Sequence, residues 1–202
     1  MKIDIKNIIS TNSEVAFVLE SPHTDELFHQ YPLAGEAGRE VSKFLLDRYD
    51  VPFGLIAKKK ELVEILNLPT HGNFSIVNIS KKPLQKMAYT KNNILAPSNI
   101  ELLEKLKRLI EQGAEFATNH RDASLNKLKK EMYENFKREC EDKLKKHKIL
   151  VPCGRFARVF CKQLQAESSV LKFELIDDIP HPSSGWSSLD KDELAKLKRY
   201  IS

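Results

Sequence analysis

Long apolar runs are missing from this chain of 202 residues. No stretch approaches the roughly 18 consecutive apolar residues that a membrane-spanning helix needs. The first residues, MKIDIKNIISTNSE, contain no long apolar core followed by a small-residue cleavage site, which a secretory signal would have. We therefore expect a cytoplasmic protein that is neither secreted nor inserted in a membrane.

Cysteine is scarce, and its spacing fits neither a disulfide framework nor a metal site. The three cysteines, Cys140, Cys153 and Cys161, include no CxxC pair and have no histidines placed beside them as zinc ligands would be. We predict reduced, buried thiols and no bound metal.

Aromatic residues are few, and the charge is close to balanced. Aromatics make up 8% of the chain, so any surface for stacking on bases is small and local. The 33 Lys and Arg residues against 28 Asp and Glu give a net charge of +5, which suits a polyanionic partner without requiring one.

A chain of 202 residues is long enough for one hydrophobic core and short for two. We expect a single domain over residues 1–202 and a monomer.

Short runs rich in β-branched and aromatic residues, bounded by turn residues, predict four buried strands. They lie at 15–19, 74–79, 148–152 and 171–176. Segments with helical spacing separate or follow them, at 36–49, 58–66, 98–113, 123–146 and after Asp190. Ser98 and Glu101 form a capping-box pattern, and Gly113 ends that helix. This alternation predicts an α/β fold, a three-layer α/β/α sandwich around a central, mostly parallel four-stranded sheet.

The helix predicted at 123–146 is the most one-sided of these helices. Lysines and glutamates occupy most positions outside its apolar stripe, which consists of Leu125, Leu128, Met132, Phe136 and Leu144. Because the charges are of both signs, we interpret the polar side as a solvated outer face, with a nucleic-acid-facing helix as the alternative.

Polar residues follow several of the predicted strands. Glu20 comes after VAFVL, Asn78 after FSIV and Gly154 after ILVPC, and His181 opens the segment HPSSGW. Ligands of open α/β sheets bind outside the carboxyl ends of the strands, so these groups are expected to meet in one pocket.

The chemistry of these residues suits recognition of a nucleobase. Asn78 can both donate and accept hydrogen bonds, as reading the edge of a base demands. Gly35 and Gly38, in GEAG, would let backbone approach a ligand closely at a helix N-terminus, where an anion is favoured.

The order of these motifs resembles that of the uracil-DNA glycosylase superfamily, and most closely its family-four type. The first family motif is similar to VLESPH followed by YPLAGEAG, through Glu20, Pro22, Pro32, Gly35 and Gly38. The middle motif, an Asn followed by basic residues and Pro, is similar to NISKKP, and the closing HPS occurs at 181–183. The resemblance covers about residues 15 to 186 and leaves 114–147 unaligned, as an expected helical insertion.

This resemblance implies a monofunctional DNA glycosylase that hydrolyses the N-glycosidic bond of flipped-out uracil or another damaged or modified base. Glu20 would orient or deprotonate the attacking water and stabilise the cationic sugar, while His181 would donate to a carbonyl oxygen of the departing base. The residues expected to contact the base are Asn78, Ser21, His23, Tyr31 and Leu33. The residues expected to contact DNA are Gly35, Gly38, Lys81, Lys82, Ser183, Ser184 and Trp186, with Trp186 as the wedge that fills the gap left by the base.

Three departures from the family pattern shape these expectations. The cysteines that hold the iron–sulfur cluster of family-four enzymes have no counterparts, so we predict no cluster and no cofactor. Leu33 stands where the family has the aromatic that stacks on the base, which leaves Tyr31 or Phe28 as substitutes. Ser21 stands where other members have their catalytic Asp, which shifts that role to Glu20.

Two other functions stay open. One is a catalytically inactive protein of this fold that binds DNA or a protein partner. The other is a hydrolase of free nucleosides or nucleotides, which needs neither a basic surface nor a wedge. Some residues also have structural alternatives: Trp186 as a core residue, His23 as a solvated loop residue, and Ser183 with Ser184 as an ordinary turn.

Overall fold

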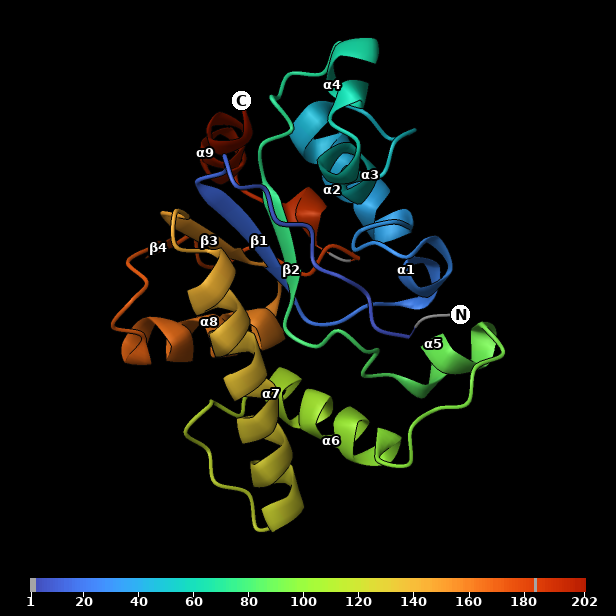
Figure 1. The fold of residues 1–202 in the computed structure, drawn as a ribbon, viewed down its shortest axis with the longest axis vertical. Helices are drawn as coiled ribbons and strands as arrows, with labels where there is room; N and C mark the ends of the chain where they lie inside the picture. The colour runs from blue at the N-terminus through green and yellow to red at the C-terminus, as the bar shows by residue number, and fades with distance from the viewer. Residues whose placement is uncertain (1–2, 184) are drawn as a thin grey trace.

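A sheet of four parallel strands lies at the centre of the computed structural model, which describes residues 3–183 and 185–202 (Figure 1). The strands are β1 (Val15–Leu19), β2 (Ser75–Asn78), β3 (Ile149–Pro152) and β4 (Glu174–Leu175). Their order across the sheet is β2-β1-β3-β4, and each neighbouring pair is parallel. The predicted α/β sandwich is confirmed.

Helices cover both faces of this sheet (Figure 1). Within the described residues they are α1 (Thr24–His29), α2 (Glu36–Leu46), α3 (Phe53–Lys58), α4 (Glu61–Ile65), α5 (Lys86–Lys91), α6 (Ile100–Glu111), α7 (Ala123–Lys143), α8 (Arg155–Glu167) and α9 (Lys191–Ile201), with a short 3₁₀ helix, η1 (Trp186–Ser188). Residues alternate between the two faces along each strand. Ala16 and Val18 of β1 pack with α5 to α8, and Phe17 and Leu19 pack with α2, α3 and α9.

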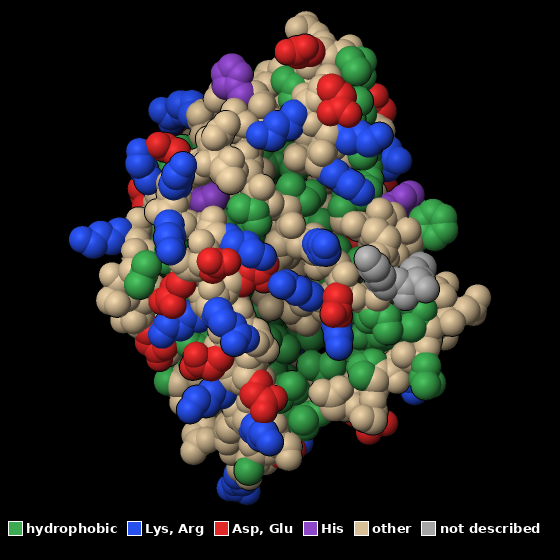
Figure 2. All heavy atoms as spheres, viewed as in Figure 1, with side chains coloured by type: hydrophobic (Ala, Val, Ile, Leu, Met, Phe, Trp, Pro, Cys, Tyr) green, Lys and Arg blue, Asp and Glu red, His purple; other side chains and the backbone are tan. Residues whose placement is uncertain are grey.

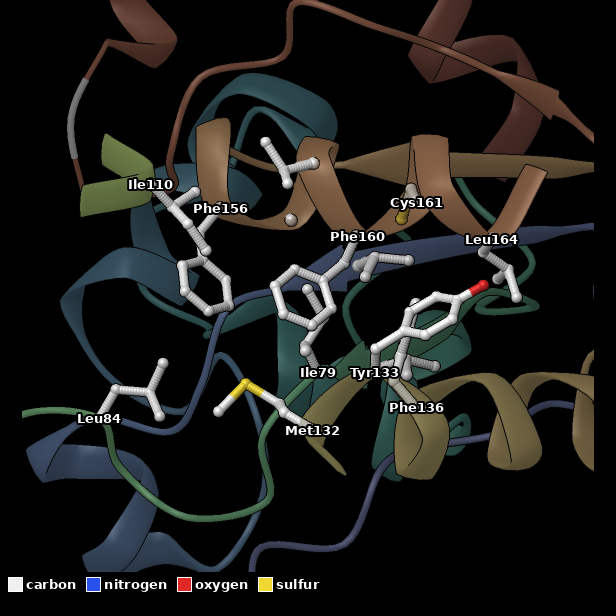
Figure 3. Close-up of a cluster of buried hydrophobic side chains, with 14 of the residues drawn as sticks. Ile79, Leu84, Ile110, Met132, Tyr133, Phe136, Phe156, Phe160, Cys161 and Leu164 are labelled. Carbon is white, nitrogen blue, oxygen red and sulfur yellow. The ribbon is translucent and has the colours of Figure 1, made fainter. Parts of the chain in front are cut away.

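Helix α7 is built into the core on one face of the sheet. Tyr133 and Phe136 of α7 lie against Phe160 of α8, with ring centroids 6.4 and 6.5 Å from the Phe160 ring (Figure 3). Phe156 of α8 stacks on the same ring at 5.0 Å. The segment expected as an insertion therefore supplies a large part of the apolar layer beneath the sheet.

The polar side of α7 fits the interpretation of a solvated face. Figure 2 shows basic and acidic side chains mixed over the face of the molecule on which α7 lies. Several pair with each other, as Lys143 does with Glu139 at 2.8 Å and Lys127 with Glu131 at 3.9 Å. This surface therefore does not present charge of a single sign to a polyanion.

A segment near the N-terminus borders the edge strand β2. Ile8 forms an antiparallel bridge with Ile76, and the Ile5 N–H donates to the Lys81 carbonyl at 2.9 Å. The Asn7 side-chain oxygen accepts a hydrogen bond from the Asn78 backbone N–H at 2.8 Å. This segment therefore satisfies part of the backbone that a sheet edge leaves unpaired.

Several element boundaries differ from the sequence-based predictions. Strand β4 has two residues where six were expected, and the helix expected at 58–66 is the shorter α4. Helix α3, which precedes it, was not predicted. The predicted capping box is wrong, because Asn99 rather than Ser98 is the N-cap of α6 and no side chain caps that end. In contrast, the Asp190 side chain caps α9 by accepting from the Asp192 N–H at 2.6 Å.

Within residues 3–183 and 185–202, no helix combines the length and apolar character needed to cross a membrane. The three cysteines are buried and form no disulfide with one another.

Replacing Phe136 with Ala tests whether α7 is integral to the fold. Phe136 is 2% exposed, so its loss leaves a cavity against α8, and we expect the free energy of unfolding to fall by about 3–5 kcal/mol. Urea denaturation followed by circular dichroism measures this change. Lys130→Ala, on the exposed side of the same helix, should change stability by less than about 0.5 kcal/mol. Equal effects from the two substitutions would contradict an integral α7.

Candidate functional site

A cavity of about 590 Å³ opens beside the carboxyl end of β1. Its size lies within the range of sites that hold small molecules. It is lined by segments that are far apart in the sequence: residues after β1, the start of α2, the start of α5, one side of α6, and the HPS segment. Glu20 and His181, the two predicted catalytic residues, both line it.

The order of the strands explains why these segments meet. The chain leaves β1 toward β2 on one side, and β3 pairs with β1 on the other, so a crevice forms at this edge of the sheet. Gly154, two residues after the end of β3, has a φ of 89°, and its N–H donates to the Ile179 carbonyl at 2.9 Å. A Cβ on Gly154 would lie 3.1 Å from the Cβ of His181. The glycine therefore lets the segment after β4 cross the end of β3 and bring His181 to the cavity.

Glu20 is a buried carboxylate with one cationic partner. Its side chain is 5% exposed, and both carboxylate oxygens accept hydrogen bonds from Lys107 Nζ, at 2.6 and 2.7 Å. The Ser21 hydroxyl donates to the same carboxylate at 3.2 Å, and the Glu20 carbonyl accepts from the Ser80 N–H at 3.0 Å. A carboxylate removed from water needs such a partner to stay charged. The end of β1 thus presents an oriented anion.

His181 is held as a neutral imidazole in one tautomer. Burial, which has the largest effect, acts together with Lys107 and His23 to lower its pKa from 6.5 to about 4, and Glu111 opposes this shift. Its Nδ1 accepts a hydrogen bond from the Ser183 backbone N–H at 3.2 Å and lies 2.8 Å from the Ser183 hydroxyl. Since a backbone N–H can only donate, Nδ1 carries the lone pair and the proton is on Nε2. At neutral pH, His181 is therefore an uncharged donor.

Glu26 of α1 ties the start of that helix to the loop that follows it. Its two carboxylate oxygens accept hydrogen bonds from the backbone N–H groups of His23 and Leu33. Burial raises the pKa of Glu26 to about 7, and these hydrogen bonds partly oppose that rise. His23 and Leu33, both predicted to contact the base, line the cavity, and the His23 ring lies 3.0 Å from the Gln85 side-chain oxygen.

The two glycines of GEAG allow other parts of the chain to pack closely against the start of α2. A Cβ on Gly35 would meet an Asp25 carboxylate oxygen at 1.9 Å, and one on Gly38 would meet the Leu33 carbonyl oxygen at 1.9 Å. Gly35 lines the cavity, whereas Gly38 is buried beneath the loop. The expected close approach of backbone is present, and its partners in this structure are Asp25 of α1 and Leu33 in the loop that follows α1.

Asn78 and Tyr31 lie outside the cavity lining. Asn78 is 1% exposed, and its side-chain oxygen and nitrogen both lack hydrogen-bond partners within the described residues. Its register partner Leu19 does line the cavity. Tyr31 is 8% exposed, with Lys58 Nζ 4.8 Å from its ring centroid. The structure therefore brings the acid and the imidazole together and leaves the Asn78 amide next to, but not in, their cavity.

Most of the predicted DNA contacts lie elsewhere. Trp186 is 2% exposed and its Nε1 donates to the Pro180 carbonyl at 3.2 Å, which fits the core alternative and not the wedge. Lys81 and Lys82 line a second hollow between α6 and α7, where Lys81 pairs with Glu139 at 2.8 Å. Ser183 lines the cavity, and Ser184 falls outside the described residues.

The lining of the cavity is acidic. Lys107 is the one Lys or Arg among its described lining residues. The carboxyl groups are those of Glu20, Asp25, Glu26, Glu36 and Glu111. A ligand group that carries negative charge is therefore disfavoured here unless it reaches Lys107.

Lys107, Glu26 and Glu111 were not predicted from the sequence. Lys107 lies on an ordinary amphipathic helix and is one of 33 Lys and Arg residues, so its contact with Glu20, 87 positions away, leaves no local signal. Glu26 follows His23 at capping-box spacing, but His is not a usual N-cap residue.

No protein-family model matches this chain, and no curated protein matches it in sequence.

The ionisation state of His181 is directly measurable. We expect its ring to titrate near pH 4, below the ordinary value of 6.5, and to carry its proton on Nε2 above that pH. NMR of histidine-labelled protein reports both properties, with His181→Gln used to assign the signal. Ser183→Ala keeps the backbone N–H and should preserve the tautomer.

This lowered pKa also affects folding. His181 binds a proton below about pH 6.5 in the unfolded chain, but only near pH 4 in the folded protein. Because the unfolded chain binds more protons between these two values, the free energy of unfolding should decrease as the pH falls through that interval. A native His181 that titrates near 6.5, or that is protonated on Nδ1, would contradict the site as described.

Proposed function

We propose that the protein is an N-glycoside hydrolase, a DNA glycosylase that removes a flipped-out damaged or modified base. The observation that supports this proposal most is that Glu20 and a neutral His181 line one cavity at the carboxyl edge of the sheet. The order of motifs that resembles the uracil-DNA glycosylase superfamily supports it independently.

Glu20 suits the sugar side of this reaction. Breaking the N-glycosidic bond builds positive charge on the sugar, which a fixed carboxylate stabilises. Glu20 is anchored by strand β1, and its oxygens are oriented by Lys107 and Ser21. The same carboxylate can orient the attacking water or accept its proton.

His181 suits the base side. The departing base gains negative charge on its carbonyl oxygens, and a positioned donor stabilises that charge. The Nε2–H group can act as this donor, because Ser183 occupies Nδ1 and the described residues offer no hydrogen-bond partner for Nε2. A neutral donor stabilises the base without having to lose a proton.

Met87 offers the apolar side chain that extrusion of a base requires. A flipped base leaves a gap in the stack, which glycosylases fill with an inserted side chain. Met87, at the start of α5, is 48% exposed and lines the cavity, whereas Trp186 is buried. We assign the wedge role to Met87.

The acidic lining favours a second candidate, a hydrolase of free nucleosides. A nucleoside carries no phosphate, so the carboxylates around the cavity would not repel it. Glu20 and His181 would act on its glycosidic bond in the same way. This candidate needs neither Met87 nor a basic surface.

Substitution of the two catalytic residues tests the reaction. Glu20→Gln and His181→Ala should each slow release of the base by about 10²–10⁴-fold, the usual contribution of a positioned acid or base. One set of substrates is oligonucleotides that contain uracil, hypoxanthine, xanthine or modified cytosines, and release of a base is detected by cleaving the product strand at the abasic site. The second set is the corresponding free nucleosides, for which release of the base is measured by chromatography. Glu40→Gln and His29→Ala, outside the cavity lining, are matched controls and should keep the wild-type rate.

The outcomes separate the candidates. Release from oligonucleotides supports the glycosylase, and release from nucleosides alone supports the second candidate. Binding of oligonucleotides by the wild-type protein without release of any base would favour the inactive alternative, and wild-type rates in both variants would remove the catalytic assignment.

Met87→Ala tests the wedge. If the side chain fills the gap in duplex DNA, the variant should lose about 1–3 kcal/mol of duplex binding, comparable to the loss of one base-stacking contact. Fluorescence anisotropy with a duplex that contains the preferred base measures this change. Leu95→Ala removes an apolar side chain that is 91% exposed and lies outside the cavity, and it should bind like the wild type. Equal binding by both variants would argue against a wedge at Met87.

A further inference from the structure

Lys107 occupies a fixed place at the cavity wall. It lies in the last two turns of α6, and its neighbours Leu106 and Ile110 are fully buried in the core against the sheet. Glu111, one turn later on the same side, also lines the cavity. Since packing sets the rotation of α6, the Lys107 side chain is directed to the cavity by the core and not by its own contacts.

The contact of Lys107 with Glu20 uses the whole carboxylate. The ammonium group lies 2.6 and 2.7 Å from the two oxygens, and the Lys107 side chain is 22% exposed, so little water surrounds the pair. A hydrogen bond between charged groups in such surroundings is shorter and stronger than one between neutral groups. Rotation of the Glu20 side chain would break both contacts at once.

The same ammonium group acts on His181. The charged and titratable groups that bear on His181 are Lys107 and Glu111 from α6 and His23 from the loop before α1. Of the three, Lys107 has the largest effect, and it opposes a second positive charge on the imidazole. One lysine therefore acts on two residues: it holds the Glu20 carboxylate through two hydrogen bonds and opposes positive charge on the His181 ring.

We infer that Lys107 is a positioning residue of this site, which fixes the Glu20 carboxylate at the cavity and places a single positive charge beside His181. This inference rests on the proposed function for its catalytic meaning. The contacts themselves do not depend on which glycoside is cleaved. Removing Lys107 should impair both catalytic residues, because it holds the Glu20 carboxylate in place and opposes positive charge on His181.

Substitutions at Lys107 test this inference. Lys107→Met removes the charge, Lys107→Arg keeps it, and Lys105→Met removes an exposed lysine from the same helix, where it pairs with Asp122 at 3.1 Å. We expect Lys107→Met to raise the pKa of His181 from about 4 toward 6.5, as measured by NMR of labelled histidine. Lys107→Arg and Lys105→Met should leave that pKa unchanged.

A double variant keeps the test decisive if Lys107→Met does not fold, since that substitution leaves Glu20 buried without its cation. Glu20→Gln combined with Lys107→Met removes both charges. Comparison with Glu20→Gln alone isolates the effect of Lys107, and the pKa of His181 should be higher in the double variant. Equal values in these two proteins would overturn the inference.

Activity gives a second readout. Lys107→Met should slow base release by about 10²-fold, the size of effect that follows from misplacing a reacting group, and Lys107→Arg should recover most of the rate. Because the reaction needs neutral His181, a raised pKa shifts the acidic limb of the pH–rate profile to higher pH. A wild-type rate and profile in Lys107→Met would overturn the inference. If the wild-type protein releases no base from any substrate, the proposed function fails, while the His181 titrations still decide whether Lys107 acts on this ring.

Discussion

The parallel sheet is the constraint on which the site depends. Parallel strands place all their carboxyl ends at one edge, so the loops after β1, β2 and β3 must emerge together. With β1 between β2 and β3, the acid that follows β1 lies near the middle of that edge. The HPS segment reaches the same place because Gly154 has no side chain to block it. The cavity is therefore a consequence of strand order, and its two catalytic candidates come from nearly opposite ends of the chain.

Much of the fold follows from patterns within single segments. Strands β1 to β3 are buried on both faces, and their continuous apolar runs locate them to within one residue at each end. Strand β4 is less regular because it lies at the edge of the sheet, where Glu174 is exposed and packing selects its residues weakly. The capping-box pattern at Ser98 failed because Asn99 begins α6 instead, one residue later. Local signals were reliable where burial was complete and weak where it was not.

The site was predictable in part, because strand ends can be located from the sequence and contacts across space cannot. Glu20 and His181 were found as polar residues after apolar runs, and they do share a cavity. Lys107 was missed because nothing distinguishes it from other lysines until α6 is packed on the sheet. Trp186 shows the opposite case: its sequence position suggested an exposed role, but its indole is buried in the core, with its ring near that of Phe44 of α2.

The segment beside β2 has a consequence for how the chain can be handled. Strand β4 is too short to offer much free backbone, so β2 is the longer of the two borders of the sheet, and residues 5–8 cover part of it through Ile8 and Asn7. A truncation that removes these residues would uncover N–H and C=O groups on an apolar strand, the kind of template on which other chains assemble into aggregates. Residues 5–8 therefore need to be retained in any shortened form of the chain that is to stay monomeric in solution.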